Sequence, residues 1–310
     1  MKHSPPKNNI ITLPVKGRVR RPLPAGRKGS NSPGTRVIAV TSGKGGVGKT
    51  NIVANLAYTL TRLQKKVLVF DADLGLGNMD VLLGKVPRYN ISHVIKGEKN
   101  IDEIIVQGPG GMRILPASSG VQDMVALNPA QRIRILSALD TLMEATDFLL
   151  IDTAAGISSN VLYFNVTAQE VIVVVTPDPT SITDAYALMK VMSLKYAEKK
   201  FILLVNMVSG EDEAKDVYRQ LRMVSKRFLD IEIEYLGYVP RDGDLIKCVR
   251  RQKLIREHCP SAAASRCFDT LAHSLSDRPA PLLPAGYAGH FWKYVLDKKF
   301  AGKGQTYADW

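Results

Sequence analysis

The stretch VIAVTSGKGGVGKT, residues 37–50, decides the fold of this chain. It opens with an apolar run at 37–41 that is typical of a buried strand, and an amphipathic helical pattern at 50–63 follows it. Residues 43–50 match the G-x-x-x-x-G-K-[ST] spacing of a phosphate-binding loop. Glycines there allow the positive φ angles that aim backbone N–H groups at phosphate oxygens. We therefore expect Lys49 to neutralise the β- and γ-phosphates and Thr50 to offer its hydroxyl to Mg²⁺.

The sequence beyond this loop repeats the strand-then-helix pattern. Further apolar runs lie at 67–71, 112–116, 148–152, 171–176, 201–206 and 233–239, and helical patterns lie at 129–144, 158–168, 180–198 and 211–228. Several runs are apolar throughout, which is typical of strands covered on both faces. The alternation predicts an α/β fold with a doubly wound, mostly parallel sheet flanked by helices.

Composition divides the chain into three predicted segments. Residues 1–35 are rich in proline and glycine, and we expect them to form an extended, basic arm. Residues 36–277 hold the strand and helix patterns and are predicted to be the nucleotide-binding domain. Residues 278–310 begin with a second Pro/Gly-rich stretch, which leads to a predicted short helix at 290–300 and a polar tail.

Carboxylates follow two of the predicted strands. Asp71 and Asp73 end the second strand, and Asp152 ends the run FLLID at 148–152. The carboxyl ends of parallel strands form the ligand-binding edge of an open α/β sheet, where Asp side chains hold Mg²⁺ or orient an attacking water. We therefore predict Thr50, Asp71 and Asp152 as metal-binding residues. The alternative for the first pair is a helix N-cap, which would explain one carboxylate more readily than both.

The segment KGGVGKT at 44–50 resembles the deviant Walker A motif of the MinD/ParA family of P-loop NTPases (the SIMIBI class). This resemblance implies a homodimer that forms on ATP binding, in which Lys44 reaches the partner's nucleotide, so that hydrolysis depends on dimerisation. It implies that Asp73 positions the attacking water and that DTAAG at 152–156 is the second switch. Lys44, Lys49 and Asp73 are thus the predicted catalytic residues. The residues expected to bind ATP from the loop are Gly43, Lys44, Gly45, Gly46, Val47, Gly48, Lys49, Thr50 and Asn51.

The same resemblance extends to base recognition. Asn206 ends a predicted strand, and its amide has the donors and acceptors to read an adenine edge. Pro240 and Asp242, in the loop after the last predicted strand, are expected to help. The alternatives are a strand-end turn for Asn206 and a helix cap for Asp242.

Longer strings are similar to one branch of the family, the FlhG/FleN ATPases that control the number and placement of bacterial flagella. They are DADLGLGNMDVLLG (71–84), YNISHVIKGE (89–98), GGMRILPASSG (110–120), IDTAAGISSNVLYF (151–164) and TPDPTSITDAYALMKV (176–191). This similarity implies an FlhF-like GTPase and flagellar switch-ring components as partners, and in some lineages a transcriptional regulator. Residues 1–36 lack the family's DQAxxLR motif, which puts stimulation of the GTPase in doubt. The alternatives are a ParA-type partition ATPase that binds DNA, a MinD-type division-site regulator, and a binding module that no longer hydrolyses.

The net charge of +13 is concentrated at the start of the chain. Residues 1–36 contain nine Lys and Arg and no acidic residue. Such an arm suits DNA, an acidic lipid surface or an acidic partner, although a solvated tail is the simpler interpretation. The three cysteines, Cys248, Cys259 and Cys267, exclude a disulfide framework and the usual zinc spacings, which favours a reducing, cytoplasmic location.

The predicted helix at 290–300 combines aromatic residues with lysines. The segment contains apolar residues interspersed with three lysines: Phe291, Trp292, Tyr294, Val295, Leu296 and Phe300, with Lys293, Lys298 and Lys299. This mixture suits an anionic lipid interface, and two such helices in a dimer would gain avidity. We therefore expect reversible, peripheral association with the inner face of the cell membrane; the alternative is that this segment packs on the domain.

Overall fold

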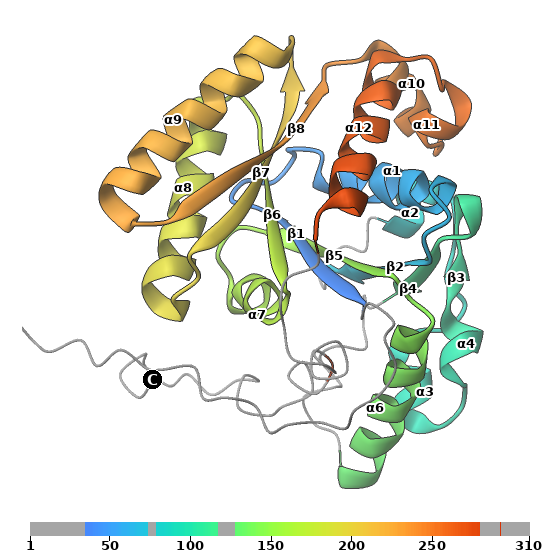
Figure 1. The fold of residues 1–310 in the computed structure, drawn as a ribbon. Coiled ribbons are helices and arrows are strands. Elements are labelled where there is room, and N and C mark those ends of the chain that lie inside the picture. The colour runs from blue at the N-terminus through green and yellow to red at the C-terminus, as the bar shows by residue number, and fades with distance from the viewer. Residues whose placement is uncertain (1–34, 74–78, 117–127, 280–291, 293–310) are drawn as a thin grey trace, which may run out of the picture.

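The computed structural model describes residues 35–73, 79–116, 128–279 and 292. Its centre is an eight-stranded sheet of order β3-β4-β2-β5-β1-β6-β7-β8 (Figure 1). Every neighbouring pair is parallel except β3–β4. The strands are β1 (Arg36–Ser42), β2 (Val67–Ala72), β3 (Val106–Gln107), β4 (Arg113–Pro116), β5 (Phe148–Ala155), β6 (Glu170–Val175), β7 (Lys200–Val208) and β8 (Glu232–Pro240). The predicted fold class is confirmed.

Alternation along the central strands divides the core into two sides. On β1, Ile38 and Val40 are buried in the cluster that contains α1, whereas Val37 and Ala39 are buried in the cluster on the opposite face. Both faces are apolar because both are covered by helices, as the continuous apolar runs predicted.

The first face is covered by the phosphate-loop helix and by the C-terminal helices (Figure 1). These are α1 (Lys49–Arg62), α2 (Met79–Leu83), α10 (Gly243–Arg250), α11 (Ile255–His258) and α12 (Ala263–Asp277), together with the 3-10 turn η1 (Pro109–Gly111). The second face is covered by α3 (Ile91–Lys96), α4 (Ile101–Ile104), α6 (Pro129–Glu144), α7 (Ser159–Thr167), α8 (Pro179–Tyr196) and α9 (Glu211–Leu229).

The short elements were missed in the sequence. β3 has two residues, and α2, α3, α4 and α11 have four to six each, which is too few for a periodic pattern to emerge. The larger omission is α12, with 15 residues, whose buried face contacts α1 and β8. The arm predicted at 1–35 and the helix predicted at 290–300 lie outside the described residues, apart from Thr35 and Trp292. Thr35 is buried, and its hydroxyl donates to the carbonyl oxygens of Met143 and Thr146, so this residue belongs to the domain and not to the arm.

The start of β1 is anchored by its first side chain. Arg36 forms a paired ion bridge to Glu170, with Nη2–Oε2 at 2.6 Å and Nε–Oε2 at 3.0 Å. Its Nη1 donates to the carbonyl oxygen of Leu275 in α12 at 2.5 Å and to that of Arg278 at 3.3 Å. Arg36, the last of the nine basic residues in 1–36, therefore belongs to the folded domain and to a buried ion pair.

One residue of the C-terminal segment is part of the core. Trp292 is fully buried, and its ring meets that of Phe70 on β2 edge-on, with the ring centroids 5.2 Å apart. It belongs to the cluster formed by α3, α4, α6 and α7. In the described part of the chain, we find no helix with the length and apolar character that crossing a membrane requires.

Candidate nucleotide and metal site

The loop between β1 and α1 has the backbone geometry of an anion cradle. Gly46 and Gly48 have φ angles of 79° and 84°, in the left-handed region that glycine tolerates best. Gly43 lies so close to α8 that an added Cβ would be 2.2 Å from the carbonyl carbon of Asp184. α1 begins at Lys49, so its free N–H groups face the loop.

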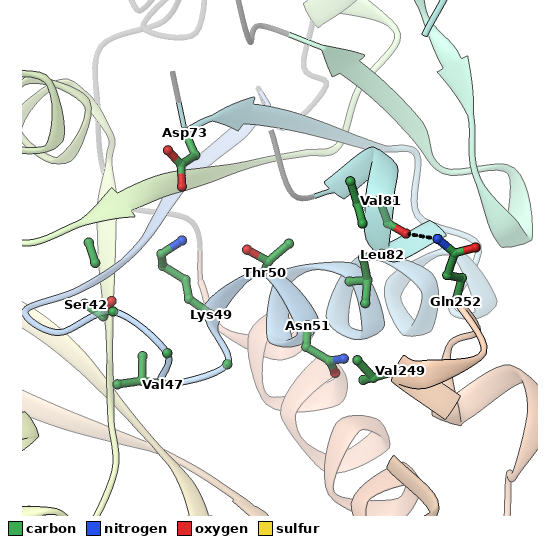
Figure 2. Close-up of a pocket in the computed structure, with 14 residues that line it drawn as sticks. Ser42, Val47, Lys49, Thr50, Asn51, Asp73, Val81, Leu82, Val249 and Gln252 are labelled. Atoms are coloured by element: carbon green, nitrogen blue, oxygen red, sulfur yellow. Dashed lines mark hydrogen bonds between the residues drawn. The ribbon is translucent and has the colours of Figure 1, made fainter. Parts of the chain in front are cut away.

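The loop borders a cavity of about 640 Å³ at the carboxyl edge of the sheet. Figure 2 shows the side chains of Lys49, Thr50 and Asp73 converging on it. The structure thus brings together most of the predicted loop residues with Asp73. The cavity is lined by Ser42, Gly45, Gly46, Val47, Gly48, Lys49, Thr50, Asn51, Asp73, Val81, Leu82, Ala155, Val249 and Gln252.

Lys49 and Asp152 form a buried ion pair beneath the cavity. Lys49 Nζ lies 2.6 Å from Asp152 Oδ1, and both side chains are almost completely shielded from solvent. Burial raises the pKa of Asp152, and the Lys49 ammonium and the Thr50 hydroxyl offset only part of that shift. The other oxygen of Asp152, Oδ2, is buried without a hydrogen-bond partner among the described residues.

This donor set fits a hydrated Mg²⁺. The ion prefers oxygen ligands and retains several waters, so it needs few protein ligands. The Thr50 hydroxyl lines the cavity, and the unpartnered Oδ2 of Asp152 provides an acceptor that a metal-bound water would satisfy.

Asp71 and Asp73 occupy different positions around this centre. Asp71 pairs with Asp152 across β2 and β5, and its carboxylate accepts hydrogen bonds from the backbone N–H groups of Asp73 and Met79, each at 3.3 Å. Burial, and next the charge of Asp152, raises the pKa of Asp71 to about 7. Asp73 lines the cavity, whereas Asp71 lines a separate, smaller pocket together with Met79.

Lys44 points away from the cavity that its own loop surrounds. Its Nζ donates to Asp178 Oδ2 at 3.0 Å and also to the hydroxyl of Thr180, at the start of α8. Hydrogen bonds from Thr180 and from Lys44 hold the pKa of Asp178 well below its usual range. Lys44 is absent from the cavity lining, so it is the one predicted catalytic residue that the structure separates from the other two.

The three predicted base-recognition residues do not line the cavity. Asn206 is buried at the end of β7, and its Nδ2 donates to the carbonyl oxygen of Val47 at 2.7 Å, so it supports the loop from below. Pro240 ends β8. Asp242 caps α10 by accepting from the N–H of Asp244 at 2.8 Å, and it also accepts from the N–H of Ala264 at 3.0 Å. The helix-cap alternative for Asp242 therefore describes its contacts.

Sequence reasoning missed the far wall of the cavity. Val249, on α10, lies beside Asn51 of α1 (Figure 2). Gln252, just after α10, points toward α2, and its Nε2 donates to the carbonyl oxygen of Val81 at 2.8 Å. Nothing in the local sequence signals this wall, because it joins segments about 170 residues apart.

The comparisons with known proteins agree with one another. Residues 38–255 match the family described as the CobQ/CobB/MinD/ParA nucleotide binding domain. The chain is 43% identical to the antiactivator FleN of Pseudomonas aeruginosa over 274 residues, which are 88% of this chain and 98% of that protein. It is 38% identical to the flagellum site-determining protein YlxH of Helicobacter pylori over 243 residues, 78% of this chain and 82% of that protein.

A solved structure has the same arrangement of sheet and helices. MinD in the MinC:MinD cell division protein complex of Aquifex aeolicus superposes with a TM-score of 0.62 at 26% identity. The match covers 80% of this chain and 98% of that one.

Proposed function

Because this chain belongs to the CobQ/CobB/MinD/ParA nucleotide-binding family, we propose that its ATPase works as a dimerising switch that regulates the number and placement of bacterial flagella. The ATPase itself and the relation to flagellar regulators follow from the family match and from the similarity to FleN and YlxH. The proposal adds three points: ATP-dependent dimerisation, reversible binding to the membrane, and the identity of the protein partners.

The residues around the cavity support Mg·ATP as the ligand. Lys49 would exchange its partner Asp152 for the β- and γ-phosphates, while Thr50 and Asp152 would hold the hydrated Mg²⁺. The metal would supply charge neutralisation at the transferred phosphoryl group. Asp73 is the carboxylate that lines the cavity, and its role in this scheme is to orient the attacking water.

The position of Lys44 is the main observation that supports the proposed dimer. Its ammonium is bound to Asp178 and Thr180 and lies outside the wall of its own cavity. The contact is half-exposed, so the lysine is free to leave it when a better anion is offered. In the proposed dimer that anion is the triphosphate in the partner's cavity.

The burial of Trp292 supports a link between nucleotide binding and membrane binding. The side chain lies against Phe70, one residue before Asp71 on the same strand. We propose that ATP-dependent rearrangement around Asp71 and Asp73 loosens this contact, and that the C-terminal segment then binds anionic lipid. Partners follow from the same branch of the family: an FlhF-like GTPase and components of the flagellar switch ring.

A complementation assay tests the proposed dimer. Lys44→Gln and Asp73→Ala are each expected to bind ATP and to turn it over slowly. If Lys44 acts in the partner's site, a mixture of the two variants regains turnover, because mixed dimers contain one site with both residues intact. If Lys44 acts in its own site, the mixture stays inactive, since no single chain has both residues.

The flagellar role is tested in cells. Deletion of the gene is expected to change the number or position of flagella while septa remain normally placed. Normal flagella with misplaced septa would contradict the pathway and leave the ATP switch. A Lys44→Gln allele at the native locus should reproduce the deletion, whereas an Arg266→Gln allele, at an exposed position on α12, should not.

A further inference from the structure

Two of the three cysteines lie in contact with each other. The Sγ atoms of Cys248 and Cys259 are 4.0 Å apart, and all three cysteines are free thiols in the structure. Cys248 is buried on α10, and Cys259 is half-buried at the end of α11. The two helices contact each other, and both sulfurs belong to one region of the apolar core beside α1.

The segment between these cysteines forms part of the wall of the nucleotide cavity. Val249 and Gln252 line the cavity, and Gln252 donates the hydrogen bond that holds the carbonyl of Val81 on α2. Near the other end of the segment, the N–H of Arg256 donates to Asn55 Oδ1 at 3.4 Å, and Asn55 Nδ2 in turn donates to Asn51, another lining residue. A bond between the two sulfurs would therefore restrain the cavity through two sets of contacts. One is the hydrogen bond from Gln252 to Val81, and the other runs from Arg256 through Asn55 to Asn51.

We propose that Cys248 and Cys259 form a reversible disulfide when the chain meets a hydroperoxide, and that this bond slows ATP turnover. The sulfurs need to approach from 4.0 Å to a bonded distance of about 2.05 Å. Each sulfur then has to move by about 1 Å, which is within the reach of side-chain rotation and a small helix shift.

The two thiols differ in burial, and this difference determines which of them reacts first with the peroxide. Burial, and next the hydrogen bond with Cys259, raises the pKa of Cys248 to about 11. Cys259 is the more accessible thiol, so its thiolate attacks the peroxide first. One peroxide oxygen bonds to Cys259 Sγ to give a sulfenic acid, and the other leaves as water or, from an organic peroxide, as an alcohol.

The second step closes the bond. Cys248 Sγ attacks the sulfenic sulfur of Cys259, the Cys248 proton passes to the departing hydroxyl, and water leaves. In total, two thiols are oxidised to one disulfide and one peroxide is reduced. A dithiol reductant reverses the reaction by thiol–disulfide exchange.

Slower turnover follows from where the new bond lies. It closes a ring around residues 249–258 and fixes the wall to which α2 is attached through Gln252. α2 also contacts α1, the helix that begins at Lys49, so a fixed wall restrains both helices beside the cavity. We expect oxidation to lower the turnover rate by about threefold, a size usual for coupling through a packed network.

Peptide mass spectrometry on the full chain tests bond formation independently of activity. The chain is treated with hydrogen peroxide, blocked with iodoacetamide and digested with trypsin, which cleaves between the two cysteines. The expected product is a crosslinked pair of peptides containing Cys248 and Cys259, which dithiothreitol separates. Crosslinks through Cys267, crosslinks between chains, or only sulfinic and sulfonic acids would overturn the proposal.

Matched variants separate the bond from other oxidative damage. Cys267→Ser is the control: it should keep both the crosslink and the slowing of turnover, with recovery on reduction. Cys259→Ser, at the less buried of the pair, should lose both effects and keep basal turnover. If peroxide slowed ATP turnover equally in Cys259→Ser, the disulfide would not be the cause of the slowing. If the proposed dimer were wrong, the crosslink and the slowing of turnover on oxidation would both still be expected.

Discussion

At the scale of single residues, the Lys49–Asp152 pair is the most constrained feature of the site. Both groups are buried, and the 2.6 Å contact neutralises each charge inside the core. A buried charge that loses its partner is costly, even where the intact pair contributes little to stability. Lys49 therefore supports the fold when nucleotide is absent, in addition to its proposed part in phosphate binding.

We predict that Lys49→Met lowers the free energy of unfolding by about 3–5 kcal/mol at pH 7, measured by urea denaturation without nucleotide. The loss should shrink as the pH falls, because the raised pKa of Asp152 rises further without the lysine and the carboxyl takes up a proton. The double variant Lys49→Met/Asp152→Asn should recover part of the stability. A deficit that is the same at pH 5 and pH 8 would contradict the explanation by charge.

Asp71 makes the stability of the metal-free chain depend on pH. Its pKa of about 7 in the folded chain lies above the value of about 3.9 for an unfolded aspartate, so the folded state binds more protons between these values. Stability from this group is therefore present at low pH and is lost as the pH rises from about 4 to about 7.

Asp71→Asn should remove this dependence. With EDTA and no nucleotide, the variant is expected to gain stability relative to the parent chain as the pH rises from 5 to 8, by a few kcal/mol at most. Urea midpoints at the two pH values measure the gain. An equal difference at both values would contradict the assignment, and Asp80→Asn, at the half-exposed start of α2, is the control.

At the scale of elements, the phosphate loop is held between two others. Gly43 packs against the backbone of α8, and Asn206 of β7 supports Val47 from below. The motif at 43–50 predicted the loop, the strand before it and the helix after it, because all three lie within a short stretch of sequence. It could not predict α8 and β7 as neighbours, since those contacts depend on the order of strands in the sheet.

Gly43→Ala is expected to force α8 away, because its Cβ would lie 2.3 Å from the carbonyl oxygen of Asp184. We predict a loss of about 1–3 kcal/mol in the free energy of unfolding, typical of overpacking. Gly45→Ala is the matched control for stability, because nothing lies within 4 Å of its Cβ position. Thermal denaturation of both variants measures the difference; similar losses in the two would show that α8 is not the obstacle.

At the scale of the whole molecule, long-range contacts determine what could be read from the sequence. The apolar runs predicted seven of the eight strands and the parallel sheet, because buried parallel strands have a distinctive composition. The contact of Lys44 with Asp178, the wall at Gln252 and the hydrogen bond from Ala264 to Asp242 escaped prediction, since each joins residues that only the finished fold brings together.

Trp292 provides a reporter for the whole molecule. The chain has two tryptophans, so a Trp310→Phe background leaves Trp292 as the single tryptophan, which is excited selectively at wavelengths that tyrosine does not absorb. We expect it to be protected from acrylamide without nucleotide and to become accessible with Mg·ATP and anionic vesicles. The same chain carrying Lys49→Met should stay protected. Protection of Trp292 under all conditions would contradict release of the C-terminal segment.

The contacts of Arg36 have a further consequence for how the chain can be rearranged. Because this side chain donates to the carbonyl oxygens of Leu275 and Arg278, the start of the central strand β1 and the C-terminal end of α12 lie side by side. A short linker from Arg278 to Thr35 should therefore give a circularly permuted domain, opened instead at the exposed residues 85–86. Such a permutant would keep every strand pairing of the sheet and leave the edge with the phosphate loop untouched.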